Sequence, residues 1–155
     1  AEEAIIQVLR EAYPSHSILA EESGETGPEA ETEYQWIIDP LDGTTNFTRR
    51  MNYSSISVAL VHNGQTEYGV VYNPFVGELF AARRGHGATL NGAPIHVSGN
   101  DVPHAIVVCG STIYDRTYTD RNFSILRRLY GMSRKKVLFY NVWRIMPPDS
   151  LTSVC

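Results

Sequence analysis

Apolar and polar residues at the start of the chain recur with the spacing of a helix. The apolar positions lie one, three or four residues apart: Ala4, Ile5, Val8, Leu9 and Ala12. This spacing places them on one face of an amphipathic α-helix. Pro14 cannot continue a helix, because it lacks a backbone N–H and its ring clashes with the preceding turn. The pattern therefore predicts a helix that ends before Pro14.

Short apolar runs after this helix have the length of strands. Residues 18–20 and 34–38 predict two strands, and the intervening residues 23–33, with two glycines and a proline, predict a surface loop. The pair Asp39-Pro40 is expected to end the second strand.

The middle of the chain has the pattern of successive hairpins. Strands are predicted at residues 55–61, 69–72, 78–82, 95–97 and 105–109. Asn63-Gly64 is a turn signal between two of them, and the glycines at 85, 87 and 92 predict a loop. Residues 120–130 predict a second helix, with Gly131 as its C-cap. The expected fold class is α+β, with a largely antiparallel sheet packed with helices.

Composition narrows the classes of protein that the chain can represent. Its 155 residues, 43% of them hydrophobic, suffice for one core without a disulfide or metal staple. The only cysteines are Cys109 and Cys155, which supports neither a disulfide framework nor a cysteine zinc site. No apolar run has the length of a membrane span, and the first residues are acidic where a secretion signal is basic. We expect a cytoplasmic protein without membrane contact.

Charge is distributed unevenly behind a net charge of −4. Six glutamates and no basic residue lie within residues 21–33, whereas residues 116–144 are mostly basic. The basic segment has little aromatic interleaving and no recognised nucleic-acid module. Solvated charge is therefore the favoured interpretation over nucleic-acid binding.

The densest group of chemically capable residues follows the strand at 34–38. Asp39 and Asp42 can converge from one tight turn, and Gly43 allows the backbone to turn sharply or to approach a ligand. If a helix begins there, its first N–H groups and the Thr44 hydroxyl form an anion site. Carboxylates beside such a site suit Mg²⁺ and phosphate. The alternative is an ordinary turn, because Asp-Pro and Asp-Gly also occur in turns and caps.

Electrostatics favour a cation in this cluster. Two carboxylates about 4 Å apart repel by about 4 kcal/mol at an effective dielectric of 20. A third acid could come from the pair Glu21 and Glu22, whose adjacent side chains point to opposite faces of a strand. Glu22 is the candidate, and a solvated acidic loop is the alternative.

Five segments together resemble the inositol monophosphatase family. They are residues 18–24 (ILAEESG), 36–47 (WIIDPLDGTTNF), 55–60 (SISVAL), 68–72 (YGVVY) and 83–92 (RRGHGATLNG). The resemblance implies the N-terminal half of an αβαβα sandwich. It also implies that Glu22 is shared between metals, that Asp39 and Asp42 are the bridging and second-metal ligands, and that the Leu41 carbonyl is a further ligand.

The same resemblance implies a reaction. Gly43 and Thr44 resemble phosphate-binding N–H groups, and the Thr44 hydroxyl with Glu22 resembles the pair that orients the attacking water. The implied chemistry is direct hydrolysis assisted by Mg²⁺, without a phosphoenzyme. The implied substrate is a small phosphomonoester such as myo-inositol 1-phosphate. Alternatives are a sister phosphatase for fructose bisphosphate, histidinol phosphate or a phosphoadenosine nucleotide, and a non-catalytic binding or regulatory fragment.

The resemblance covers residues 1–131 and sets residues 132–155 apart as an atypical tail. The family's second half, with a Trp-Asp metal ligand, has no counterpart in this sequence. We therefore expect this chain to be less active than an intact relative. For an intact chain the resemblance makes a homodimer possible.

Overall fold

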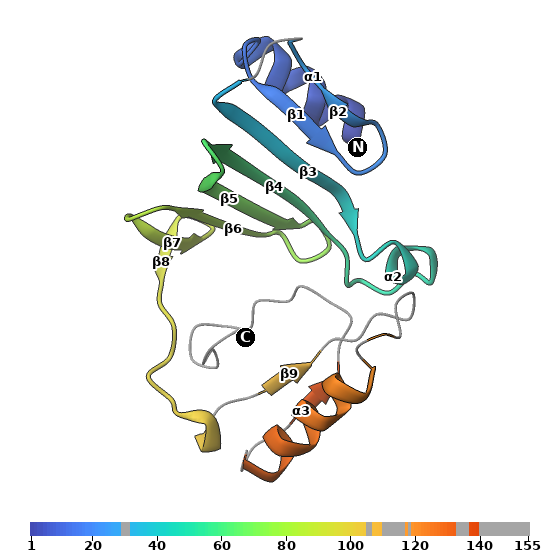
Figure 1. Cartoon of the computed structure of the whole chain (residues 1–155), viewed down its shortest axis with the longest axis vertical. Helices are drawn as coiled ribbons and strands as arrows, with labels where there is room; N and C mark the ends of the chain where they lie inside the picture. Colours follow the sequence, from blue (N-terminus) through green and yellow to red (C-terminus); the bar gives the residue numbers. More distant parts are fainter. Residues whose placement is uncertain (29–31, 105–106, 110–116, 118, 133–136, 140–155) are drawn as a thin grey trace. The chain divides into compact units, whose positions relative to one another are not determined.

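The structure is a computed structural model that describes the chain except for residues 29–31, 105–106, 110–116, 118, 133–136 and 140–155. The chain divides into two compact units, Ala1–Ile95 and His96–Cys155 (Figure 1). The predicted site residues all lie in the first unit.

The first helix, α1 (Glu2–Ala12), is present where the sequence predicts it, but the buried face overlaps the predicted one only in part. Glu2 and Leu9 are buried and Ile5 and Ile6 are half-buried, whereas Val8 is 63% exposed. These four inward residues lie at i, i+3, i+4 and i+7, which is one helix face. The predicted face was right for Ile5 and Leu9 but wrong for Ala4, Val8 and Ala12, which are exposed, and it left out the charged Glu2.

Eight strands form one sheet in the first unit. They are β1 (Ser17–Ala20), β2 (Gly24–Thr26), β3 (Tyr34–Asp42), β4 (Ser55–His62), β5 (Gln65–Asn73), β6 (Glu78–Arg83), β7 (Gly87–Leu90) and β8 (Ala93–Ile95). Their order is β2-β1-β3-β4-β5-β6-β7-β8, with only β1 and β3 parallel. The predicted α+β class with a largely antiparallel sheet is confirmed.

Two predicted loops contain short strands. β2 lies within residues 23–33 and pairs with β1, and β7 lies between the glycines at 85 and 92 and pairs with β6. Glycines 85, 87 and 92 have positive φ and sit at or beside the ends of β7. They mark turns around a strand rather than one long loop. The strand predicted at 95–97 is β8, which ends at Ile95.

Strand β3 continues through Asp39-Pro40 instead of ending there. Asp39 pairs with Ser57 of β4, and the next pair is Asp42 with Ser55, so the register shifts between them. A bulge tolerates a proline, which has no N–H to give to the ladder. The prediction that Asp39-Pro40 ends the strand was wrong because the sequence does not show this irregularity. Asp39 and Asp42 consequently belong to one strand.

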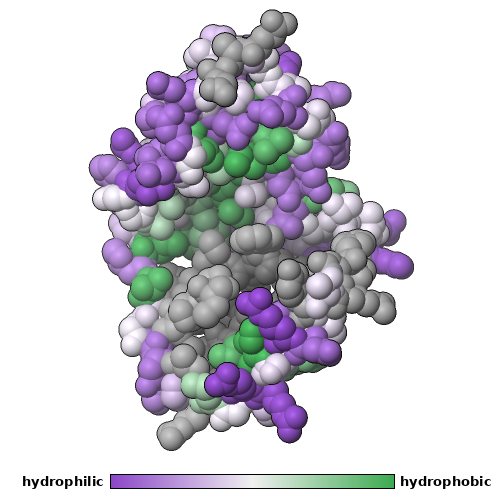
Figure 2. Space-filling model, in the orientation of Figure 1, coloured by the Kyte–Doolittle hydropathy of each residue, from purple (hydrophilic) through white to green (hydrophobic). Residues whose placement is uncertain are grey.

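The core lies between α1 and one face of the sheet. Leu9, Ile18, Ala20 and Ile38 form the buried cluster, with Trp36 among the side chains packed against it. Leu19 and Ile37, which alternate with these strand residues, are 38% and 40% exposed and therefore lie on the other face. Figure 2 shows apolar side chains gathered over the strands of the first unit.

The second unit contains the 3₁₀ helix η1 (Val102–His104), β9 (Val107–Cys109), α3 (Thr119–Met132) and β10 (Val137–Phe139). β9 and β10 are parallel. Part of the strand predicted at 105–109 lies outside the described residues. The predicted second helix is confirmed, but it continues through Gly131, so the expected C-cap was wrong. Within the described part of the chain, no helix has the length and apolar character needed to cross a membrane.

Candidate active site

The ends of β1 and β3 bring two acidic residues together. These strands are parallel, with Ala20 opposite Ile38, and the Glu21 N–H donates to the Ile38 carbonyl at 3.2 Å. Glu21 therefore follows β1 at the level where Asp39 follows Ile38 on β3. Both side chains come after a buried apolar residue, on the strand parity opposite to the core.

The Glu21 and Asp39 carboxyl groups interact directly. The negative charge of Asp39 raises the pKa of Glu21, and a hydrogen bond between the two side chains adds to the shift. The charges of Glu22 and Asp42 act in the same direction with smaller effect.

Asp42 is the third acid of this cluster. Its partial burial raises the pKa of Asp42 to about 6, with a further contribution from the charge of Asp39. A backbone hydrogen bond from Gly43 opposes the rise. Within the described residues, none of the ion pairs includes Glu21, Asp39 or Asp42. The cluster thus carries repulsion that a bound cation would relieve.

The backbone between the two aspartates is fixed by short-range hydrogen bonds. Asp39 Oδ1 accepts the Leu41 N–H at 3.1 Å, and the Leu41 carbonyl accepts the Thr44 hydroxyl at 3.1 Å. The first contact is the aspartate turn chemistry that the sequence offered as an alternative to metal binding. The same turn lies between Asp39 and Asp42, so turn chemistry does not exclude a role for these carboxylates in binding a cation.

Gly43 joins β3 to the short helix α2 (Thr44–Thr48) in a left-handed conformation, with φ 86° and ψ 39°. A Cβ at this position would lie 2.8 Å from the Tyr53 carbonyl oxygen. The Gly43 carbonyl accepts hydrogen bonds from the Phe47 N–H and the Ser54 hydroxyl, each at 3.0 Å. Only glycine fits this conformation and this close approach. Gly43, the residue before α2, is therefore held by Tyr53 and Ser54, which directly precede β4.

The structure brings Glu21, not Glu22, to Asp39, whereas the residue predicted from the sequence was Glu22, and which of the two serves the site stays a prediction. Both glutamates are exposed, but the Glu21 N–H donates to the Ile38 carbonyl of β3, whereas the Glu22 N–H donates to Glu2 on α1. Burial alternates along β1, with Ile18 and Ala20 buried and Leu19 exposed. All three are apolar, so the sequence contains no sign of which glutamate faces the site.

The acids fit a hard divalent cation by their chemistry. Carboxylate oxygens and a nearby backbone carbonyl are the ligands that Mg²⁺ takes in proteins. Within the described residues, however, no three histidine, cysteine, aspartate or glutamate side chains stand close enough to hold an ion as they are placed. Glu21, Asp39, Asp42 and the Leu41 carbonyl are the groups that could hold one after their carboxylates turn inward.

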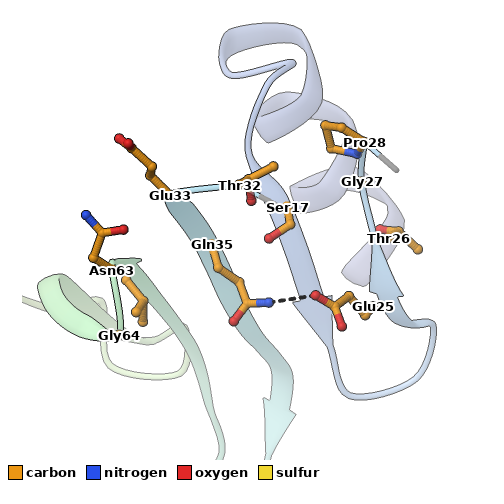
Figure 3. Close-up of a pocket in the computed structure, with 11 residues that line it drawn as sticks. Ser17, Glu25, Thr26, Gly27, Pro28, Thr32, Glu33, Gln35, Asn63 and Gly64 are labelled. Carbon is orange, nitrogen blue, oxygen red and sulfur yellow. Dashed lines mark hydrogen bonds between the residues drawn. The ribbon is translucent and has the colours of Figure 1, made fainter. Parts of the chain in front are cut away.

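The pocket in Figure 3 lies elsewhere in the first unit. It has a volume of about 570 Å³ and is lined by residues of β2, the start of β3 and the turn at Asn63-Gly64. Gln35 donates to Glu25 across it at 2.9 Å. None of the predicted site residues lines it. The acidic cluster is at the opposite end of β3, so this pocket is not the candidate site.

This chain belongs to the inositol monophosphatase family, whose family model matches residues 1–146. The match includes part of the segment 132–155 that the sequence analysis sets apart, and the division at 131 stays a prediction. The predicted family resemblance is confirmed.

Individual relatives cover most of this chain. The Nus factor SuhB of Escherichia coli K12 is 41% identical over 132 residues, which are 84% of this chain and 49% of that protein. The extragenic suppressor protein SuhB of Bartonella henselae superposes with a TM-score of 0.83 at 31% identity, covering 91% of this chain and 54% of that one. The inositol monophosphatase of Anabaena (Nostoc) sp. PCC 7120 superposes with a TM-score of 0.80 at 38% identity, covering 89% of this chain and 54% of that one. The chain spans about half the length of these relatives.

Proposed function

We propose that the chain carries the metal- and phosphate-binding part of a Mg²⁺-dependent phosphomonoesterase. The observation that carries this proposal is the acidic cluster of Glu21, Asp39 and Asp42, in which two pKa values are raised by burial and like charge. Groups with perturbed pKa values, gathered beside a glycine-led helix start, are typical of catalytic sites. Membership of the inositol monophosphatase family supports the same chemistry.

The proposed roles follow from the chemical character of each group. Glu21, Asp39, Asp42 and the Leu41 carbonyl hold the metal, and the N–H groups of Gly43 and Thr44 bind phosphate oxygens. A bound Mg²⁺ supplies positive charge for the phosphoryl oxygens and makes water more acidic. Glu21 takes the place that the sequence analysis gave to Glu22. With the Thr44 hydroxyl, it orients the attacking water.

The proposed substrate is a small phosphomonoester, with myo-inositol 1-phosphate as the first choice. The name of the Anabaena relative, inositol monophosphatase, supports this choice. Fructose bisphosphate, histidinol phosphate and a phosphoadenosine nucleotide remain the sister substrates to compare. A cytoplasmic location and, for an intact chain, a homodimer belong to the same proposal.

Phosphate release tests the proposal on this chain. The wild type, Asp39→Asn and the surface control Glu3→Gln are incubated with each substrate, with Mg²⁺ or with EDTA. We expect slow release, below that of an intact relative, that requires Mg²⁺, is lost in Asp39→Asn and is retained in Glu3→Gln. Release that is equal in EDTA or in Asp39→Asn would overturn the proposal.

A second candidate is a binding role without catalysis. The E. coli relative is named a Nus factor, which gives this alternative its support. The absence of both phosphate release and Mg²⁺ binding by the wild-type chain would favour it over the phosphatase.

A further inference from the structure

Glu2 is a buried carboxylate that the proposed chemistry does not use. The residue is 7% exposed and lies on the face of α1 that packs against the sheet with Leu9. Glutamate is almost never buried without partners, because removing its charge from water is costly. Its place among apolar neighbours therefore calls for specific hydrogen bonds.

Both carboxylate oxygens of Glu2 accept hydrogen bonds from the turn after β1. Oε2 accepts the Glu22 N–H at 3.1 Å, and Oε1 accepts the Ser23 N–H at 3.0 Å. A hydrogen bond from the Ser23 side chain, together with these two, holds the pKa of Glu2 below its ordinary value. Donors that converge on a carboxylate favour its ionised form and make strong hydrogen bonds.

The turn that Glu2 holds is the one that carries Glu21. Residues 21–23 connect β1 to β2, and the pair of residues that flanks this turn is Ala20 with Gly24. The Glu21 N–H is bound to the Ile38 carbonyl of β3, and the next two N–H groups are bound to Glu2. Three successive N–H groups are thus fixed, one by the sheet and two by α1.

We propose that Glu2 is a positioning residue, which anchors residues 21–23 so that the Glu21 side chain stays beside Asp39. This inference rests on the proposed function, because Glu21 matters there as a metal ligand. The Glu21 and Asp39 charges repel when both are ionised, and an unanchored turn can relieve the repulsion by moving away from β3. Glu2 opposes that movement through the backbone and touches neither substrate nor metal.

Two variants on the same helix separate anchoring from a general effect of charge. Glu2→Gln keeps the size of the side chain, but its amide has one acceptor oxygen, so one N–H of the turn faces an NH₂ group. Glu3→Gln removes the same charge from the exposed neighbouring position. Thermal unfolding of both variants reports whether each remains folded.

Amide hydrogen exchange in the metal-free 155-residue chain is the first readout. We expect the Glu22 and Ser23 amides to exchange about tenfold faster in Glu2→Gln, as the loss of a hydrogen bond to a charged group predicts. The β4 amides should be unchanged, as should all amides in Glu3→Gln. Equal exchange of Glu22 and Ser23 in the two variants would overturn the anchoring.

Mg²⁺ affinity, measured by calorimetry on the same samples, is the second readout. We expect affinity to fall about tenfold in Glu2→Gln, the lower range for groups that orient metal ligands, and to stay at the wild-type value in Glu3→Gln. Faster exchange with unchanged Mg²⁺ affinity would overturn the positioning role and leave Glu2 a structural residue. A wild-type chain that binds no Mg²⁺ overturns the proposed function, whereas the exchange result still decides whether Glu2 anchors the turn.

Discussion

The two ends of β3 are built from opposite kinds of interaction. At its start, the Tyr34 ring stacks between His16 and His62 with centroid distances of 4.8 and 4.2 Å, and Trp36 Nε1 donates to His16 Nδ1 at 3.1 Å. At its C-terminal end, the carboxyl groups of Asp39, Asp42 and Glu21 lie close enough for their negative charges to repel one another.

This difference places stabilising contacts at one end of β3 and charge repulsion at the other. The aromatic end satisfies its polar groups with partners inside the chain, so it adds to the free energy of unfolding. The acidic end keeps like charges together, which lowers that free energy, and a bound cation would offset the repulsion. Strain that persists in this form is characteristic of binding sites, because the ligand removes it.

Mg²⁺ should produce the largest change, and only through the acidic end. At about 100 times its dissociation constant, a ligand that binds only the folded state raises the free energy of unfolding by about 2.7 kcal/mol. We expect thermal unfolding of the wild type to move upward with Mg²⁺ and to return with EDTA, and Asp39→Asn to show no shift. The same shift in Asp39→Asn would mean that Mg²⁺ binds elsewhere.

Gly43→Ala should lower the free energy of unfolding by about 2 kcal/mol. The added Cβ would sit on a left-handed backbone and would clash with the Tyr53 carbonyl oxygen, a backbone atom that cannot rotate away as a side chain can. The matched control is Gly24→Ala, which has φ +70° but nothing within 4 Å of the added Cβ, and should cost about 1 kcal/mol. Urea unfolding measures both. Equal losses of stability in the two variants would show that the Tyr53 backbone moves away from the added Cβ.

Trp36→Phe should lower the free energy of unfolding by about 1.5 kcal/mol through loss of the hydrogen bond to His16 and of packing volume. Because this change is confined to the aromatic end, Mg²⁺ affinity should remain within twofold, on the order of the error of calorimetry. The exposed Tyr72→Phe serves as the control. A large loss of Mg²⁺ affinity in Trp36→Phe would contradict the separation of the two ends.

Asp42→Asn should raise the free energy of unfolding of the metal-free chain at pH 7 by about 1 kcal/mol. This is less than the whole pKa shift of Asp42 would give, because solvent reaches this carboxyl and screens its charge. The pKa of Asp42 is about 6 in the folded chain against an ordinary 3.8, so the folded state binds more protons between these values. Stability of the wild type therefore falls as pH rises through this window. Unfolding in EDTA at several pH values should show the variant's advantage above pH 6 and none below about pH 3.8. An advantage independent of pH would contradict the assignment.

Local patterns were enough to predict most strands and the Asp39, Asp42, Gly43 and Thr44 group. Each depends on chemistry within a few residues: a β-branched run, an Asn-Gly turn, or a glycine after an acidic pair. The extension of β3 through Pro40 was missed, because a bulge depends on the pairing with β4.

The pairing register between strands distant in sequence places the residues that local sequence patterns could not place. Glu21 and Glu22 are equivalent until Ala20 is paired with Ile38. Glu2 was missed although a signal existed, since it lies three, four and seven residues before Ile5, Ile6 and Leu9 on the apolar helix face. A charged residue at such a position indicates a specific partner, and here the partners are the N–H groups 20 and 21 residues further along the chain.

Mn²⁺ binding followed by electron paramagnetic resonance, with Glu21→Gln and Glu22→Gln side by side, tests the central claim most directly. The two variants remove one charge each from adjacent residues of the same turn. If Glu21 faces Asp39 as a ligand, Glu21→Gln should weaken Mn²⁺ binding by about 100-fold, and Glu22→Gln should leave it at the wild-type value. Equal binding by the two variants, or a loss confined to Glu22→Gln, would contradict the account.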